Sequence, residues 1–288
     1  MIRYACIGAG GIARKKHLQG YSRLPQVELA AICDTNRAAA EALAREYGIP
    51  RVYTDYRELL QVEKPDLVSI CTPNVTHKDI TIAALEQGAC VHVEKPMTMN
   101  AAEAREVLEA QKRTGKLVQV GLNKRFTSAA VLLRRLLEAG YFGEIYHVRC
   151  GWERNSGIPG TGRWFTNRAL SGGGALIDLG VHYLDLGMLA MGWPEPEKAV
   201  GALSGCFLDG GGRIRRGYRS ADGINDVEDS AAGAVRMKDG KLLEYAFRWA
   251  ANIQKETQYV QGLGTKAGFR LEDDSLELYI QLGGTMFR

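Results

Sequence analysis

Short apolar runs alternate with helix-like segments over the first 122 residues. The runs cover residues 4–8, 29–33, 67–71, 90–93 and 117–121, with a very short sixth at 52–53. They lack the alternation of half-exposed strands, which is typical of a parallel sheet buried on both faces. The segments between them at 37–47, 76–87 and 101–114 have helical patterns, and each is followed by glycine, the residue favoured just past a helix. The pattern predicts right-handed crossovers and a doubly wound α/β domain.

The turn after the first run reads G-x-G-x-x-A, and Asp34 ends the second run. This is the fingerprint of a dinucleotide-binding turn, with alanine for the third glycine. Gly8 makes the tight turn, Gly10 lets the backbone approach a pyrophosphate, and Ala13 is small enough for the helix to pack on the sheet. The helix N-terminus offers N–H groups to the phosphates. The turn residues predicted to bind the dinucleotide are Gly8, Gly10, Gly11, Ile12 and Ala13.

Asp34 also bears on which dinucleotide binds. Its carboxylate can accept hydrogen bonds from both ribose hydroxyls, whereas a 2′-phosphate there would meet like charge. NAD is therefore favoured. NADP is the alternative, because Arg37 is close by in the sequence and could offset part of the repulsion.

Further motifs resemble the Gfo/Idh/MocA family of oxidoreductases. The two most specific are Glu94-Lys95-Pro96 and the D-x-x-x-H pattern from Asp178 to His182, which follows three glycines. The resemblance also covers Thr72-Pro73-Asn74 with His77, and the sequence G-L-N-K-R-F at 121–126.

This resemblance implies a nicotinamide-binding Rossmann domain at 1–122 and an α+β domain at 123–288. The second domain would have a largely antiparallel open sheet that bears the substrate site. We expect its strands to run from about Cys206 onward, and an uncovered apolar sheet face to drive association into a homodimer or homotetramer. Family members continue some tens of residues further, so we expect the second domain to be incomplete at its C-terminus.

Asp178 and His182 lie four residues apart in a segment that is apolar almost all round. An i, i+4 pair shares one face of a helix, and ionisable groups on a buried helix are paired or functional. The residues alone leave a structural hydrogen-bond cluster and catalysis equally open. The resemblance favours catalysis, with Lys95 and His182 flanking a reacting hydroxyl. His182 would then move the proton, Lys95 would stabilise the oxygen, and Asp178 would orient His182 or bind a substrate hydroxyl. Lys95 as the proton carrier is left open.

Other residues are predicted to line the site. The resemblance places Asn123 beside the cofactor and Arg125 beside the substrate, with a domain-linking turn as the alternative. Thr72, Pro73, Asn74, Glu94 and Lys95 are expected at the cofactor groove, and His77 is as consistent with a helix cap or packing. An aromatic and basic cluster is expected to form a wall for the substrate: Trp152, Arg154, Arg163 and Trp164.

Composition and cysteine spacing bear on whether the protein binds nucleic acid or metal and where in the cell it works. Lys and Arg number 37 against 33 Asp and Glu, an excess too small to predict a nucleic-acid partner. None of the six cysteines forms a C-x-x-C pair, so we expect reduced thiols, no metal and a cytoplasmic location. The apolar stretch 174–193 contains two aspartates and a histidine, which favours a buried helix over a membrane span. The glycine-rich basic run 209–219 is read as a connection between strands, with a phosphate site as the alternative.

Together these features predict an NAD-dependent oxidoreductase. It would transfer a hydride between nicotinamide and a ring secondary alcohol of a sugar, sugar derivative or inositol. One alternative is an NAD-dependent glycosidase that oxidises a ring alcohol transiently. The other is a non-enzymatic nucleotide-sensing regulator.

Overall fold

The computed structural model describes residues 1–208, 223–282 and 285–288. The run 209–219 lies outside the described residues. The chain divides into two compact units, Met1–Gly121 and Leu122–Arg288, and each is described by itself.

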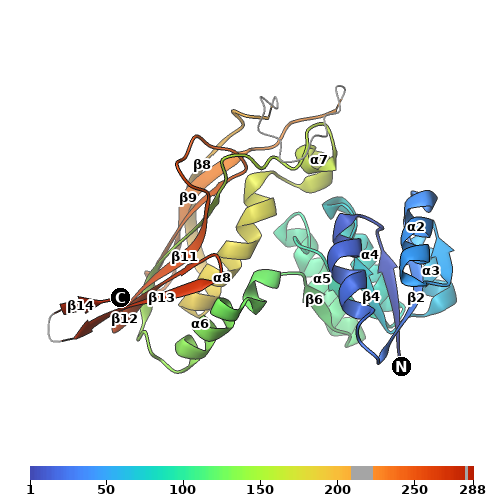
Figure 1. The fold of residues 1–288 in the computed structure, drawn as a ribbon, viewed down its shortest axis with the longest axis horizontal. Coiled ribbons are helices and arrows are strands. Elements are labelled where there is room, and N and C mark those ends of the chain that lie inside the picture. The colour runs from blue at the N-terminus through green and yellow to red at the C-terminus, as the bar shows by residue number, and fades with distance from the viewer. Residues whose placement is uncertain (209–222, 283–284) are drawn as a thin grey trace. The chain divides into compact units, whose positions relative to one another are not determined.

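The first unit contains a six-stranded parallel sheet with the strand order β3-β2-β1-β4-β5-β6 (Figure 1). Its strands are β1 (Ile2–Ile7), β2 (Val27–Cys33), β3 (Arg51–Tyr53), β4 (Leu67–Ile70), β5 (Cys90–Val93) and β6 (Val118–Val120). Its helices are α1 (Gln19–Tyr21), α2 (Arg37–Tyr47), α3 (Tyr56–Glu63), α4 (His77–Glu86) and α5 (Ala101–Thr114). A π-helical stretch, Ala13–Leu18, precedes α1.

Both faces of this sheet are buried, which explains the continuous apolar runs. On β1, Ala5 and Ile7 belong to an apolar cluster with residues of α3, α4 and α5. Tyr4 and Cys6 point the other way and pack with residues of α2 and of the π-helical stretch. The predicted doubly wound α/β fold is confirmed.

Local signals fix the ends of the predicted helices. The Asn36 side chain accepts a hydrogen bond from the N–H of Ala39 at the start of α2, which ends at Gly48 with a φ of +69°. Asn100 and Gly115 bound α5 in the same way. Short polar side chains satisfy free N–H groups at a helix start, and glycine adopts the left-handed conformation past its end. Helix α3 was not predicted.

The second unit contains a mixed sheet of eight strands in the order β14-β13-β12-β11-β7-β10-β9-β8. All neighbours are antiparallel except β7 and β10. The strands are β7 (Ile145–Glu153), β8 (Pro196–Ser204), β9 (Ser230–Met237), β10 (Leu242–Arg248), β11 (Thr257–Gly264), β12 (Ala267–Glu272), β13 (Ser275–Leu282) and β14 (Thr285–Phe287). The expected start near Cys206 is wrong, because β7 and β8 precede it and β7 is central.

Helices α6 (Ser128–Glu138) and α8 (Val181–Met191) pack on one face of this sheet, and α7 (Arg168–Ser171) is a short turn before α8 (Figure 1). The buried side chains on that face include Val148, Leu243 and Phe247. Of the described residues, one helical stretch, Arg168–Met191, has the length and composition of a membrane span. Most of its apolar window is buried inside the structure, as expected for a core helix.

The opposite face of the sheet carries paired charges on its two central strands, so at these strands the expected apolar face is interrupted. Alternate positions of β7 and β10 place Arg149 opposite Glu244, and their side chains form an ion pair at 3.0 Å. Arg248 pairs with Glu153 across the same two strands. Strand alternation puts these charges on the side away from the helices.

Of the three glycines before α8, Gly174 packs directly against Glu228. This buried carboxylate accepts hydrogen bonds at Oε1 from the N–H groups of Gly174 (2.9 Å) and Leu176 (3.1 Å). It therefore supplies the acceptor that free N–H groups at a helix start require. A Cβ at Gly174 would lie 1.8 Å from the backbone oxygen of Glu228, whereas one at Gly173 would make only ordinary contacts.

We therefore expect Gly174→Ala to lower the free energy of unfolding by at least about 1–3 kcal/mol, because backbone must move to admit the methyl group. Gly173→Ala is the matched control and should change it by less than about 1 kcal/mol. Denaturant unfolding measures both. Equal stability of the two variants would contradict the packing described.

Candidate active site

The glycine turn after β1 has the shape that a dinucleotide requires. Gly8 has a φ of +99°, and a Cβ there would lie 2.5 Å from the carbonyl oxygen of Cys71. Glycine is therefore the residue that fits. A Cβ at Gly10 or Gly11 would meet no described atom within 4 Å. That open space beside exposed backbone at a helix start suits a pyrophosphate, so these residues fit the cofactor.

Asp34 joins the glycine turn to the next helix. Its Oδ2 accepts a hydrogen bond from the N–H of Ala9 at 2.6 Å, and its Oδ1 accepts one from the N–H of Asn36 at 2.8 Å. Each carboxylate oxygen retains a lone pair for a ribose hydroxyl. Arg37 forms an exposed ion pair with Glu41 at 2.9 Å. Asp34 is therefore the charge fixed beside the turn.

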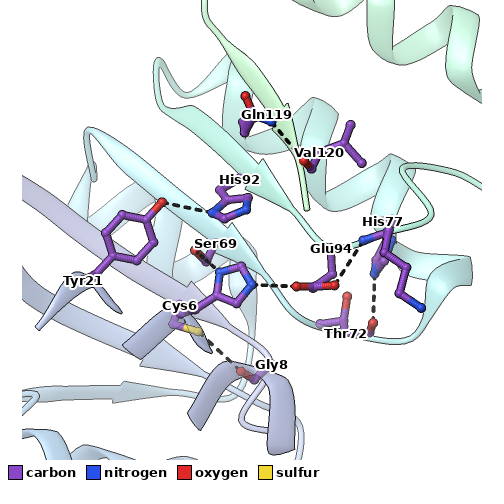
Figure 2. Close-up of polar contacts among 12 residues, drawn as sticks. Cys6, Gly8, Tyr21, Ser69, Thr72, His77, His92, Glu94, Gln119 and Val120 are labelled. Atoms are coloured by element: carbon purple, nitrogen blue, oxygen red, sulfur yellow. Dashed lines mark hydrogen bonds and ion pairs between the residues drawn. The ribbon is translucent and has the colours of Figure 1, made fainter. Parts of the chain in front are cut away.

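The segment that carries Lys95 leaves β5 next to the loop after β4, because the two strands are parallel neighbours. The Lys95–Pro96 peptide bond is cis. Glu94 accepts hydrogen bonds from His17 and from the N–H of Lys95. The His77 ring contacts the carbonyl oxygen of Thr72 (Figure 2) and, with its other nitrogen, that of Pro96. Asn74 is buried in the turn that opens α4. The structure thus brings Thr72, Glu94 and Lys95 to one edge of the sheet.

In the second unit, Asp178 and His182 lie on different kinds of helix. Asp178 is in a π-helical turn, Leu176–Gly180, and His182 is in α8. The expected regular helix is therefore wrong at this point, and π-turns are frequent at functional sites. The Oδ2 atom of Asp178 accepts a hydrogen bond from Trp249 Nε1 at 2.9 Å. The His182 side chain is buried, with its ring 6.4 Å from that of Trp152.

Trp152 is the centre of an aromatic and cationic group. The Tyr183 ring meets it edge-on at 5.6 Å, and the guanidinium carbon of Arg154 lies 4.2 Å from its centroid. Lys124 Nζ lies 5.2 Å from the same ring and donates to Gln258 Oε1 at 3.1 Å. Burial lowers the pKa of Lys124, against the charge of Asp273. Of the predicted aromatic and basic cluster, Trp152 and Arg154 thus lie together, and their role as a wall for the substrate stays a prediction.

Other predicted residues have different neighbours. Arg125 donates two hydrogen bonds to Asp185, at 2.6 Å and 2.5 Å. Asn123 and Arg163 are exposed, and the Trp164 ring stacks on that of Phe165 at 3.7 Å. The site roles of these four residues stay predictions.

Sequence reasoning missed several residues of this group. Lys124 lies between Asn123 and Arg125 in a motif that the resemblance had singled out, so a signal existed. Trp249, Gln258 and His17 gave none, because their partners are distant in the sequence.

The parallel sheet, the glycine turn and the separate α+β unit are the features of a nicotinamide-dependent oxidoreductase. Residues 2–122 match the family model described as "Oxidoreductase family, NAD-binding Rossmann fold", and residues 131–270 match "GFO/IDH/MocA C-terminal domain". The chain belongs to the Gfo/Idh/MocA family, and its cofactor is NAD.

Individual relatives agree with this assignment. D-glucoside 3-dehydrogenase of Escherichia coli (strain K12) is 37% identical over 94% of this chain and 77% of that protein. The scyllo-inositol 2-dehydrogenase (NAD(+)) of Bacillus subtilis (strain 168) is 32% identical over 66% of this chain and 54% of its own length. The structure of levoglucosan dehydrogenase in complex with NADH superposes with a TM-score of 0.85, 22% identity and coverage of 99% of this chain and 78% of that one, which shows the fold. The glycosidase and regulator alternatives are not favoured.

Because Asp34 is fixed at the turn, we expect NADH to bind at least about tenfold more tightly than NADPH, or about 1.4 kcal/mol. Asp34→Ser should reduce that preference, since it removes the charge that repels a 2′-phosphate. Arg45→Gln is the control and should change it by less than about twofold, because Arg45 is exposed in the last turn of α2, away from Asp34. Fluorescence titration measures these affinities, and tighter binding of NADPH by the native protein would contradict the assignment.

Proposed function

We propose that the protein oxidises or reduces a ring secondary alcohol of a sugar, sugar derivative or inositol with NAD. The observation that carries the proposal is the buried His182 beside Trp152, with Asp178 held by Trp249 in the preceding turn. A buried imidazole is suited to moving a hydroxyl proton near neutral pH. The names of the matched relatives, a glucoside and an inositol dehydrogenase, support this substrate class.

The bound nicotinamide would accept or donate the hydride. Oxidation of an alcohol also requires the hydroxyl proton to leave, and we assign that transfer to a ring nitrogen of His182. The Lys95 ammonium would donate a hydrogen bond to the same oxygen and stabilise its developing negative charge. Asp178 would keep His182 in the required orientation.

The group around Trp152 would bind the sugar. An indole face packs on the C–H surface of a ring, and its cationic neighbours supply donors for hydroxyl groups. Arg154 and Lys124 both lie over this indole. Polar groups that must be matched by substrate hydroxyls discriminate strongly between substrates.

If these roles hold, Lys95→Met and His182→Ala should each lower kcat by about 10²–10⁴, the usual contribution of a positioned acid or base. Asp178→Asn should also lower it while the fold survives. NADH affinity should stay within about threefold, because the cofactor contacts lie on the glycine turn and Asp34. Lys78→Met, which removes a half-buried lysine paired with Glu106, is the control and should leave kcat unchanged.

Single-turnover hydride transfer and NADH titration of each variant are the measurements. The double variant of Lys95 and His182 should lose less than the product of the single losses, since both groups serve one oxygen. Near-normal hydride transfer in His182→Ala would remove it as the proton carrier and leave Lys95.

We also infer that the protein works in the cytoplasm as a homodimer or homotetramer, without a nucleic-acid or membrane partner. Free cysteines support a reducing compartment, and four of the six are buried. The face of the large sheet that carries charged pairs supports association between copies, because paired charges such as Arg149 and Glu244 can exchange partners across a symmetric interface.

We expect light scattering at micromolar concentration to give a dimer or tetramer that dissociates partly at about 1 M salt, where charges are screened. Arg149→Glu should weaken association by placing like charges together. Lys78→Met, in the first unit, is the control. A monomer at every concentration and salt level would contradict association.

A further inference from the structure

Two buried histidines make contacts on either side of Lys95: His17 with the side chain of Glu94 and His77 with the backbone of Pro96. The first is His17, in the π-helical stretch after the glycine turn. Its Nε2 donates to Glu94 Oε1 at 2.9 Å, and its Nδ1 contacts Ser69 Oγ at 2.9 Å. A neutral ring satisfies both contacts when Nε2 carries the proton and the Ser69 hydroxyl donates to Nδ1. The ring is therefore held from both ends.

Glu94 transmits this hold to Lys95. Its second oxygen, Oε2, accepts a hydrogen bond from the N–H of Lys95 at 3.3 Å. Burial raises the pKa of the Glu94 carboxyl. The hydrogen bond from His17 and the positive charge of Lys95 outweigh this effect and leave the pKa below its usual value. Glu94 is thus a carboxylate that accepts bonds from His17 and from the peptide of Lys95.

His77 holds the other side of the segment. Its side chain is buried, with Nδ1 2.7 Å from the carbonyl oxygen of Pro96. Its Nε2 lies 2.9 Å from the carbonyl oxygen of Thr72 (Figure 2). Burial lowers the pKa of His77, against the two carbonyl contacts. The ring therefore lies between the peptide after Lys95 and the loop after β4, and in its neutral form its one N–H donates to one of the two carbonyl oxygens.

We propose that His17 and His77 are positioning residues that together fix the backbone on both sides of Lys95. The inference rests on the proposed role of Lys95 and explains how that role is met. A lysine side chain is a flexible four-carbon chain. Its amine therefore has a defined position only if the backbone that carries it has one orientation. Displacement of a reacting group by about 1 Å can lower a rate by about 10²-fold. His17 further links this segment to the helix that follows the cofactor turn.

The test compares His17→Leu and His77→Leu with His17→Gln and His77→Gln. Each leucine variant should lower single-turnover hydride transfer by about 10–100-fold, with NADH affinity within about threefold. Glutamine retains a side-chain N–H donor and should recover part of the rate. Tyr21→Phe is the matched control: it removes a hydroxyl bonded to His92 in the same buried region, and should leave the rate unchanged. If His17→Leu does not fold, Ser69→Ala is measured in its place, because it removes only the hydrogen bond at one end of the His17 ring.

The same substitutions in a Lys95→Met background decide whether the histidines act through Lys95. We expect no further loss beyond about twofold there, because the group being positioned is gone. Equal losses in both backgrounds would overturn the inference. An unchanged rate in Lys95→Met alone would instead overturn the proposed role of Lys95.

If Lys95 proves to have no role in the reaction, a measurement without substrate still tests whether the histidines position it. Reductive methylation with ¹³C-formaldehyde labels the Lys95 amine, and its NMR signal is identified by its absence in Lys95→Met. We expect one signal distinct from those of exposed lysines in the native protein and a shift toward the exposed-lysine position in the leucine variants. An identical signal in all of them would show that the histidines do not position Lys95.

Discussion

A carboxylate removed from water must be met by hydrogen-bond donors, and each unit contains one that organises a functional segment. In the first unit Glu94 accepts from His17 and from the peptide of Lys95. In the second, Glu228 accepts from the N–H groups that open the helical turn containing Asp178. These bonds offset the cost of burial and also fix the backbone next to the residues proposed to do the chemistry. Glycine is needed where two backbone segments approach closely, as at Gly8 beside Cys71 and at Gly174 beside Glu228.

The parts predicted well from the sequence depend on local or periodic signals. Continuous apolar runs indicated a parallel sheet, and segments such as 37–47 were bounded by their own caps. The large sheet was predicted less well. Strand β7 was not assigned, and the face opposite α8 carries charged pairs on its central strands, where Arg149 and Glu244 alternate with buried residues. Strand pairing brings these side chains together from distant parts of the chain, so a local pattern does not reveal them.

The candidate site follows the same division. Motifs found the glycine turn, Asp34, Lys95 and the segment of Asp178 and His182. The side chains that hold them, such as His17, Trp249 and Glu228, carry no motif, because each acts on a partner more than fifty residues away. Lys124 is the intermediate case: it lay inside a recognised motif, but only the structure shows its ammonium over Trp152.

Transfer of a labelled hydride tests the central proposal most directly. A glucoside and an inositol, each deuterated at the ring carbons that bear hydroxyl groups, would be incubated with the protein and NAD, and the NADH formed would be analysed by mass spectrometry. We expect the deuterium of the oxidised carbon to appear in NADH and a keto group to appear in the ring. Consumption of the sugar with the label in water, or with unlabelled NADH, would contradict hydride transfer from a ring alcohol.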